Sequence, residues 1–72
     1  MEALVFNEEE VKLLKEIIAR YTKEGDTVLD PFAGSGSTLV ACKQLNRNYI
    51  GIEINPEYVK IAQDRLKQEV LL

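Results

Sequence analysis

Histidine is absent from this 72-residue chain, and cysteine occurs once, at Cys42. Without an imidazole there is no histidine general base and no His-based zinc site. The lone cysteine cannot form an internal disulfide, and we expect it to be a small buried core residue. Together with the lack of a signal peptide it indicates a reducing, cytoplasmic setting. No apolar run approaches the roughly 20 residues that span a bilayer, so we expect no membrane segment.

Positive charge is also scarce. Nine Lys and Arg stand against twelve Asp and Glu, which gives a formal net charge of −3. Binding to a nucleic-acid backbone requires clustered basic residues. We therefore expect the chain to bind DNA only through a partner. A hydrophobic fraction of 46% and a charged fraction of 29% are typical of a globular chain. At this length residues 1–72 form one domain at most, with a core that supplies roughly 3–5 kcal/mol.

The apolar pattern predicts a first helix over residues 8–21. Asn7 is a suitable N-cap, and Glu10 three residues later resembles a capping box. Side chains at a spacing of three and four predict one apolar face. Its members are Val11, Leu14, Ile17, Ile18 and Tyr21.

Two short β-rich runs follow, at residues 27–29 and 49–54, with a helix between them that begins at Ser37 or Thr38. Asn46 is a plausible left-handed residue at the end of that helix. A third helix is predicted to start at Asn55-Pro56, with Asn as N-cap and Pro at the first helical position. The residues expected to face inward from it are Tyr58, Ile61, Ala62, Arg65, Leu66 and Val70.

Strand, glycine-rich turn, helix and strand make a βαβ unit, and such units are right-handed and parallel in nearly all cases. The predicted order is therefore α-β-α-β-α with two parallel strands, which is an α/β fold. Parallel sheets need cover on both faces and further strands. The chain is thus predicted to be half of a doubly wound, Rossmann-like domain.

The turn after the first strand reads "DPFAGSGST", residues 30–38. Gly34 and Gly36 allow a ligand close to the backbone, and the acidic Glu53 ends the next strand, where it can accept hydrogen bonds from ribose hydroxyls. The dinucleotide fingerprint is incomplete because Leu39 stands where Gly or Ala is needed, and no P-loop pattern is present. The carboxylate of Asp30 repels phosphate and favours a cation. A nucleoside without phosphates fits better than NAD or ATP.

S-adenosylmethionine has these properties, and the chain resembles the DNA amino-methyltransferases, which methylate N4 of cytosine or N6 of adenine. The resemblance covers roughly residues 8–67 and is carried by "GDTVLDPFAGSGSTLVACKQLNRNYIGIEINPEYVKIAQDRL". The family usually has D-P-F-x-G-S-G-T-T, so Ser37 is a departure that keeps a hydroxyl. The resemblance implies a Rossmann-like methyltransferase fold and S-adenosylmethionine as cofactor.

The resemblance also implies roles for individual residues. The methionine and ribose part of the cofactor would be lined by Asp30, Phe32, Gly34, Ser35 and Gly36. Thr38 would cap the helix behind the loop, Glu53 would hold the ribose hydroxyls, and Ile54 and Asn55 would border the adenine. We expect no catalytic residue and no metal ligand in this chain.

The acceptor-side motif of the family, [DNS]-P-P-[YFW], is not found. "NPEY" at residues 55–58 resembles it, but its place after the second strand favours a helix start. The chain looks like the cofactor-binding half alone, from a split gene, a truncated remnant or a deliberate fragment. It is not expected to methylate DNA by itself, and a separate catalytic and DNA-recognition subunit would complete it. The alternative is a non-catalytic association module that keeps the half-fold without binding cofactor.

Exposed strand edges and uncovered apolar faces predict self-association, most simply as a homodimer. The apolar residues of the two strands are Leu29, Ile50, Ile52 and Ile54, and the apolar ends are residues 4–6 and 70–72.

Overall fold

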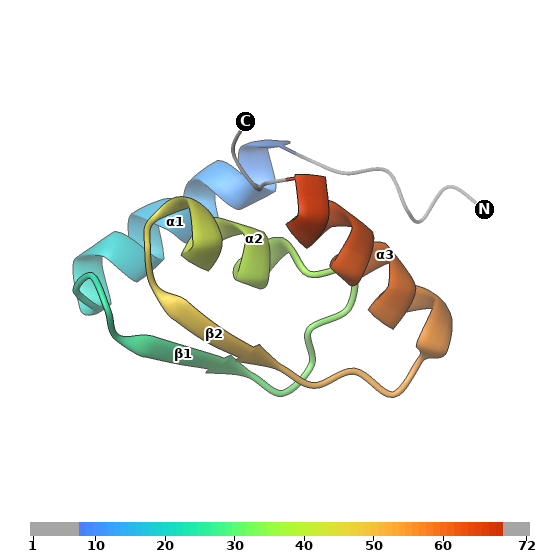
Figure 1. Ribbon diagram of the computed structural model, residues 1–72. Coiled ribbons are helices and arrows are strands. Elements are labelled where there is room, and N and C mark those ends of the chain that lie inside the picture. The colour runs from blue at the N-terminus through green and yellow to red at the C-terminus, as the bar shows by residue number, and fades with distance from the viewer. Residues whose placement is uncertain (1–7, 69–72) are drawn as a thin grey trace.

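Three helices lie on one face of a two-stranded parallel sheet in the computed structural model, which describes residues 8–68 (Figure 1). The elements are α1 (Glu8–Tyr21), β1 (Thr27–Asp30), α2 (Ser37–Gln44), β2 (Asn48–Gly51) and α3 (Pro56–Gln68). The predicted order and the parallel pairing are confirmed. The predicted cap Asn7, the inward Val70 and the apolar ends lie outside the described residues. None of the described helices is long and apolar enough to cross a bilayer.

The strands pair from Thr27 opposite Asn48 to Asp30 opposite Gly51. The prediction that the second strand continues to residue 54 is wrong, because the paired segment ends at Gly51. The reason lies on the neighbouring strand, where the Phe32 N–H donates to Asp30 Oδ1 at 3.0 Å instead of continuing the ladder. The Ile52 carbonyl accepts from the Ala33 N–H at 3.0 Å, one residue further along, so the regular pairing stops. The chain then bends into the loop that holds the candidate site.

The core lies between α1, α2 and the sheet. Val11 and Ile18 of α1 pack against α2, whose Cys42 is completely buried, and Val28 and Tyr49 cover this cluster from the sheet. The prediction that Cys42 is a core residue is confirmed. Burial raises the pKa of its thiol above the usual value of 9.0, and the nearby Arg47 charge only partly offsets this.

The apolar face of α1 is narrower than predicted. Ile17 and Tyr21 belong to the predicted apolar face but are 46% and 75% exposed, so only part of that face is buried. Among the described residues α1 packs against α2 only, and one helix covers only the side turned toward it. Leu13, also on the uncovered side, is 57% exposed. An apolar stripe of α1 therefore faces outward.

The turns between elements are held by specific contacts. Asn46 has a φ of 64°, which confirms the predicted left-handed residue after α2. Its carbonyl accepts a hydrogen bond from the Gly25 N–H at 3.1 Å. The Arg47 guanidinium donates to the Thr22 carbonyl at 2.8 Å and to its hydroxyl at 2.9 Å. These bonds tie the segment after α1 to the segment after α2 and so fix the register of the strands.

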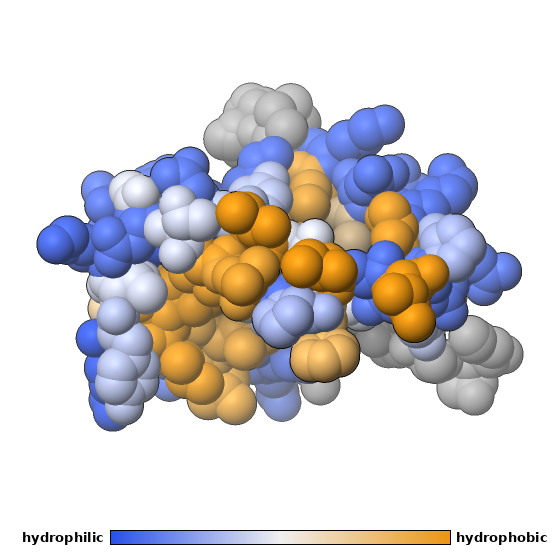
Figure 2. All heavy atoms as spheres, turned by 90° about the horizontal axis from the view of Figure 1, so that it is seen from below, coloured by the Kyte–Doolittle hydropathy of each residue, from blue (hydrophilic) through white to orange (hydrophobic). Residues whose placement is uncertain are grey.

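The other face of the sheet carries no helix within residues 8–68. Leu29 and Ile50 are directly opposed on this face and are 59% and 54% exposed. Ile52, just beyond β2, is 51% exposed. Figure 2, which looks at the molecule from the sheet side, shows apolar atoms gathered there. This bare sheet face, Leu29, Ile50 and Ile52, is a surface that a soluble chain rarely leaves open.

Candidate cofactor-binding site

The glycine loop, residues 31–36, connects the end of β1 to the start of α2. Asp30 Oδ1 accepts a hydrogen bond from the Phe32 N–H at 3.0 Å, and the Gly36 N–H donates to the Ala33 carbonyl at 2.9 Å. Gly34 and Gly36 have φ values of 57° and 91°, a region that residues with a Cβ rarely adopt. Around Gly34 no atom would lie within 4 Å of an added Cβ. The backbone at Gly34 is therefore open to a ligand.

Gly36, in contrast, is pressed against α3. A Cβ on Gly36 would lie 2.8 Å from the Ala62 Cβ and 3.2 Å from its Cα. Gly36 is also the N-cap of α2, and no side chain caps this helix. The expectation that Thr38 caps it is wrong, because α2 begins at Ser37 and the left-handed Gly36 occupies the cap position. Thr38 lies in the first helical turn instead.

The carboxylate of Glu53 joins two loops. Its Oε1 accepts from the Gly34 N–H at 2.8 Å, and its Oε2 accepts from the Asn55 N–H at 2.9 Å. Each carboxylate oxygen has about two acceptor positions, so each can accept a further hydrogen bond. Glu53, which the sequence predicts as a ribose acceptor, thus lies in contact with the glycine loop.

Arg65 of α3 is a site residue that the sequence interpretation did not identify as such. It is only 8% exposed, and its Nη1 donates to the Ser35 carbonyl at 3.0 Å, the Ser35 hydroxyl at 3.3 Å and the Ser37 hydroxyl at 3.1 Å. One signal was available: an arginine at an inward position of an apolar stripe is rarely buried without polar partners. The pattern did not reveal which residues those partners would be.

The remaining predicted residues lie around the start of α3 and on the outer side of the loop. Asn55 Oδ1 accepts from the Glu57 N–H at 2.9 Å and α3 begins at Pro56, which confirms the predicted helix start. Phe32 and Ile54 are 86% and 94% exposed. Both side chains therefore present nearly their whole apolar surface to solvent.

A cavity of about 310 Å³ lies between the glycine loop, the end of β2 and α3. Gly34 and Glu53 line it together with apolar side chains of α2 and α3, among them Leu39 and Leu66. A Cβ on Gly51 would lie 2.5 Å from the Leu39 Cδ1, so this glycine allows α2 to pack directly on β2. The volume is at the lower limit of typical ligand pockets. The described residues thus form a partly open cavity that the Glu53 side chain and apolar side chains line together.

Comparison with known proteins decides the family. The model of the DNA methylase family for N6 and N4 modification matches residues 6–64. The chain belongs to this family. Among its curated relatives are the type II methyltransferase M.Cfr9I of Citrobacter freundii, 55% identical over 58 residues, and M2.DpnII of Streptococcus pneumoniae, 56% identical over 57 residues. The predicted membership in the DNA amino-methyltransferases is confirmed.

The chain spans only about a fifth of the length of these relatives. The matches cover 81% and 79% of this chain but 19% and 21% of the two relatives.

Solved structures confirm the fold class. The M1.HpyAVI–SAM complex matches with a TM-score of 0.76 and 52% identity, over 78% of this chain and 29% of that one. TTHA0409 of Thermus thermophilus, complexed with S-adenosyl-L-methionine, matches with a TM-score of 0.79 and 38% identity, over 83% and 25%. These complexes also confirm the prediction of S-adenosylmethionine as the cofactor of this group of methyltransferases.

Proposed function

We propose that the chain binds S-adenosylmethionine and forms the cofactor-binding part of a DNA methyltransferase that modifies N4 of cytosine or N6 of adenine. The observation that carries this proposal is the position of Glu53. Its carboxylate is fixed by the N–H groups of Gly34 and Asn55 and can still accept two further hydrogen bonds. Two neighbouring ribose hydroxyls supply two such donors.

The other predicted residues take complementary roles in this proposal. Asp30 places a carboxylate at the start of the glycine loop, which favours a cationic sulfonium over a phosphate. Gly34 offers open backbone, and the exposed Phe32 and Ile54 offer apolar surface for the methionine chain and the adenine. The bound cofactor supplies the methyl group that is transferred to an exocyclic amine.

A partner subunit is part of the proposal, because within residues 8–68 we identify no pocket for the target base. Asn55 and Pro56 of "NPEY" are used to start α3, so they do not form the acceptor motif. An enzyme that acts on a base in duplex DNA must take the base out of the stack and hold it in such a pocket. We therefore assign the base pocket and DNA recognition to a separate subunit.

The proposal predicts a cofactor preference that calorimetry can measure. The chain should bind S-adenosylmethionine and its demethylated product, S-adenosylhomocysteine, weakly, since Phe32 and Ile54 have no cover from a second side. NAD and ATP should bind less tightly, because the negative carboxylate of Asp30 repels their negatively charged phosphate groups. Titrations with all four compounds under one buffer condition provide the comparison. Tighter binding of NAD than of S-adenosylmethionine would contradict the proposal.

We further propose that the isolated chain is a homodimer that covers the bare sheet face. Leu29, Ile50 and Ile52 supply an apolar face, and the stripe of α1 that contains Leu13 and Ile17 supplies a second surface. A twofold pair buries the same face of both chains and is the commonest arrangement of soluble oligomers. The association-module alternative shares this surface but requires no cofactor.

Light scattering at micromolar concentration is expected to give twice the chain mass of 8.2 kDa. Ile50→Lys places a charge on the bare sheet face and should shift the mass toward the monomer, while Lys60→Gln on the outer side of α3 should not. A monomeric wild-type chain with a cooperative thermal transition would contradict the dimer. Dimerisation without any S-adenosylmethionine binding would favour the association module.

A further inference from the structure

The glycine loop is held from two sides by two different elements. Glu53, after β2, fixes it through the Gly34 N–H at 2.8 Å. Arg65, in the third turn of α3, holds its other end through the carbonyl of Ser35 and the hydroxyls of Ser35 and Ser37. Gly36, between these two serines, lies against Ala62 one turn earlier on the same helix. The end of the loop nearest α2 is therefore shaped by α3.

Stabilisation of α2 does not explain this placement of Arg65. The hydroxyl that its Nη1 contacts belongs to Ser37, the first residue of α2. The N-terminus of a helix carries partial positive charge, so a cation there disfavours the helix. Burying a guanidinium is also costly unless its donors are satisfied. What the position of Arg65 does provide is contact with three oxygen atoms of the loop region.

The geometry of the side chain suits this purpose. The guanidinium is a rigid planar group with five donors, and it can hold several oxygen atoms in a fixed arrangement. A lysine at the same position has a single ammonium and cannot match several acceptors with the same geometry. All three contacts come from Nη1, whose two N–H groups share three oxygen atoms, so the fixed plane of the guanidinium rather than the number of its donors distinguishes arginine from lysine here.

We propose that Arg65 is a positioning residue for cofactor binding: it fixes residues 35–37 and thereby sets the conformation in which the glycine loop receives S-adenosylmethionine. The proposal rests on the proposed function for its ligand. The loop conformation itself can be measured without any ligand. Arg65 acts through the loop and need not touch the cofactor.

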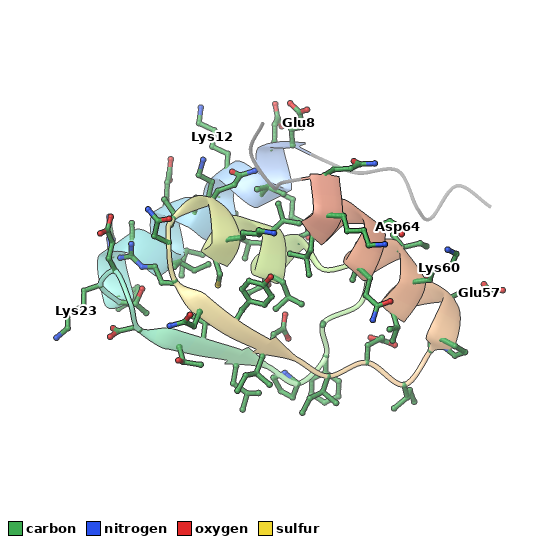
Figure 3. The ribbon with its side chains drawn as sticks, viewed as in Figure 1. Glu8, Lys12, Lys23, Glu57, Lys60 and Asp64 are labelled. Atoms are coloured by element: carbon green, nitrogen blue, oxygen red, sulfur yellow. The ribbon has the colours of Figure 1, made fainter. Side chains whose placement is uncertain are left out.

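The test compares Arg65→Gln and Arg65→Lys with a matched control on the same helix. Lys60→Gln also removes one positive charge from α3, and Figure 3 shows Lys60 on the outer side of that helix, near Asp64. The Lys60 Nζ lies 3.7 Å from Asp64 Oδ2 and both side chains are mostly exposed, so this pair is worth little. Three quantities are measured: affinity for S-adenosylmethionine, thermal unfolding, and amide hydrogen exchange at Gly34 and Gly36.

Arg65→Gln is expected to weaken S-adenosylmethionine binding at least about tenfold, the effect of losing one hydrogen bond that involves a charged group. The amides of Gly34 and Gly36 should exchange faster, while those of α1 and β1 exchange as in the wild type. Arg65→Lys should fall between the two, and Lys60→Gln should match the wild type. Methylguanidinium added to Arg65→Ala should restore part of the binding and part of the exchange protection.

Ser37→Ala keeps the proposal testable if the arginine variants do not fold. It removes one acceptor of Arg65, leaves the arginine in place and should weaken binding less than Arg65→Gln. Unchanged exchange at Gly34 and Gly36 in the folded variants would overturn the proposal. So would faster exchange spread evenly over the whole chain, which would make Arg65 a general structural residue. If the wild-type chain binds no S-adenosylmethionine, the proposed function fails, and the exchange data alone decide whether Arg65 positions the loop.

Discussion

Gly36→Ala is expected to lose about 2–5 kcal/mol of unfolding free energy, which is comparable to the whole stability of a core this small. Two effects add. The left-handed φ of 91° costs a residue with a Cβ about 1–2 kcal/mol. The new Cβ would also lie 2.8 Å from that of Ala62, and overpacking of this kind costs about 1–3 kcal/mol. Urea unfolding followed by circular dichroism measures the loss.

Gly25→Ala separates the two effects. Gly25 has a φ of 90°, almost the same as Gly36, but no atom lies within 4 Å of a Cβ placed on it. It should therefore show the conformational cost alone, and the difference between the two variants reports the contact with Ala62. Adding Ala62→Gly to Gly36→Ala should recover part of the loss. Equal destabilisation of the Gly25 and Gly36 variants would show that α3 does not press on the loop.

Glu53→Ala is expected to have the largest effect on cofactor binding. The change removes the acceptor for the ribose hydroxyls, and hydrogen bonds to a charged group contribute about 1.5–3 kcal/mol. It also leaves the N–H groups of Gly34 and Asn55 without their carboxylate, so the loop loses one of its two attachments. Calorimetry with S-adenosylmethionine should therefore show a decrease in affinity of at least about tenfold.

Two further variants make this result specific. Glu53→Gln retains the shape of the side chain but turns an NH₂ group toward a backbone N–H, so it should also bind weakly. Glu57→Gln removes a carboxylate from the exposed start of α3, where Figure 3 shows it pointing to solvent, and should bind like the wild type. Wild-type affinity in Glu53→Ala would exclude Glu53 as the ribose acceptor.

Local sequence signals predicted the elements of this fold well. The bounds of α1 and the start of α3 at Asn55-Pro56 follow from apolar spacing and capping preferences, which depend on neighbouring residues only. The end of β2 could not be predicted in the same way, because it depends on how the other strand bends at Phe32 and Ala33. Ile17 and Tyr21 belong to the predicted apolar face of α1 but are exposed, because periodicity identifies an apolar stripe and not how much of it a neighbouring element covers.

In the candidate site, too, features that depend on local spacing could be predicted, and features that depend on contacts between elements could not. Glu53 and the glycines could be predicted as candidates because a carboxylate near the end of the second strand and small residues after the first have a known spacing. The role of Arg65 was missed because its partners, Ser35 and Ser37, are 30 and 28 positions away and on another element. A contact at that separation depends on how α3 packs on α2, and residue spacing along one helix carries no information about it.

The double contact of Glu53 has an entropic consequence. A flexible carboxylate would lose its rotational freedom when a ligand arrives, and ordering one such side chain costs about 0.5–1.5 kcal/mol. In this chain the Gly34 and Asn55 N–H groups already restrict Glu53 to one orientation. Any ligand that donates to it therefore meets an acceptor that is already ordered, and the cost of ordering is included in the free energy of folding rather than in that of binding.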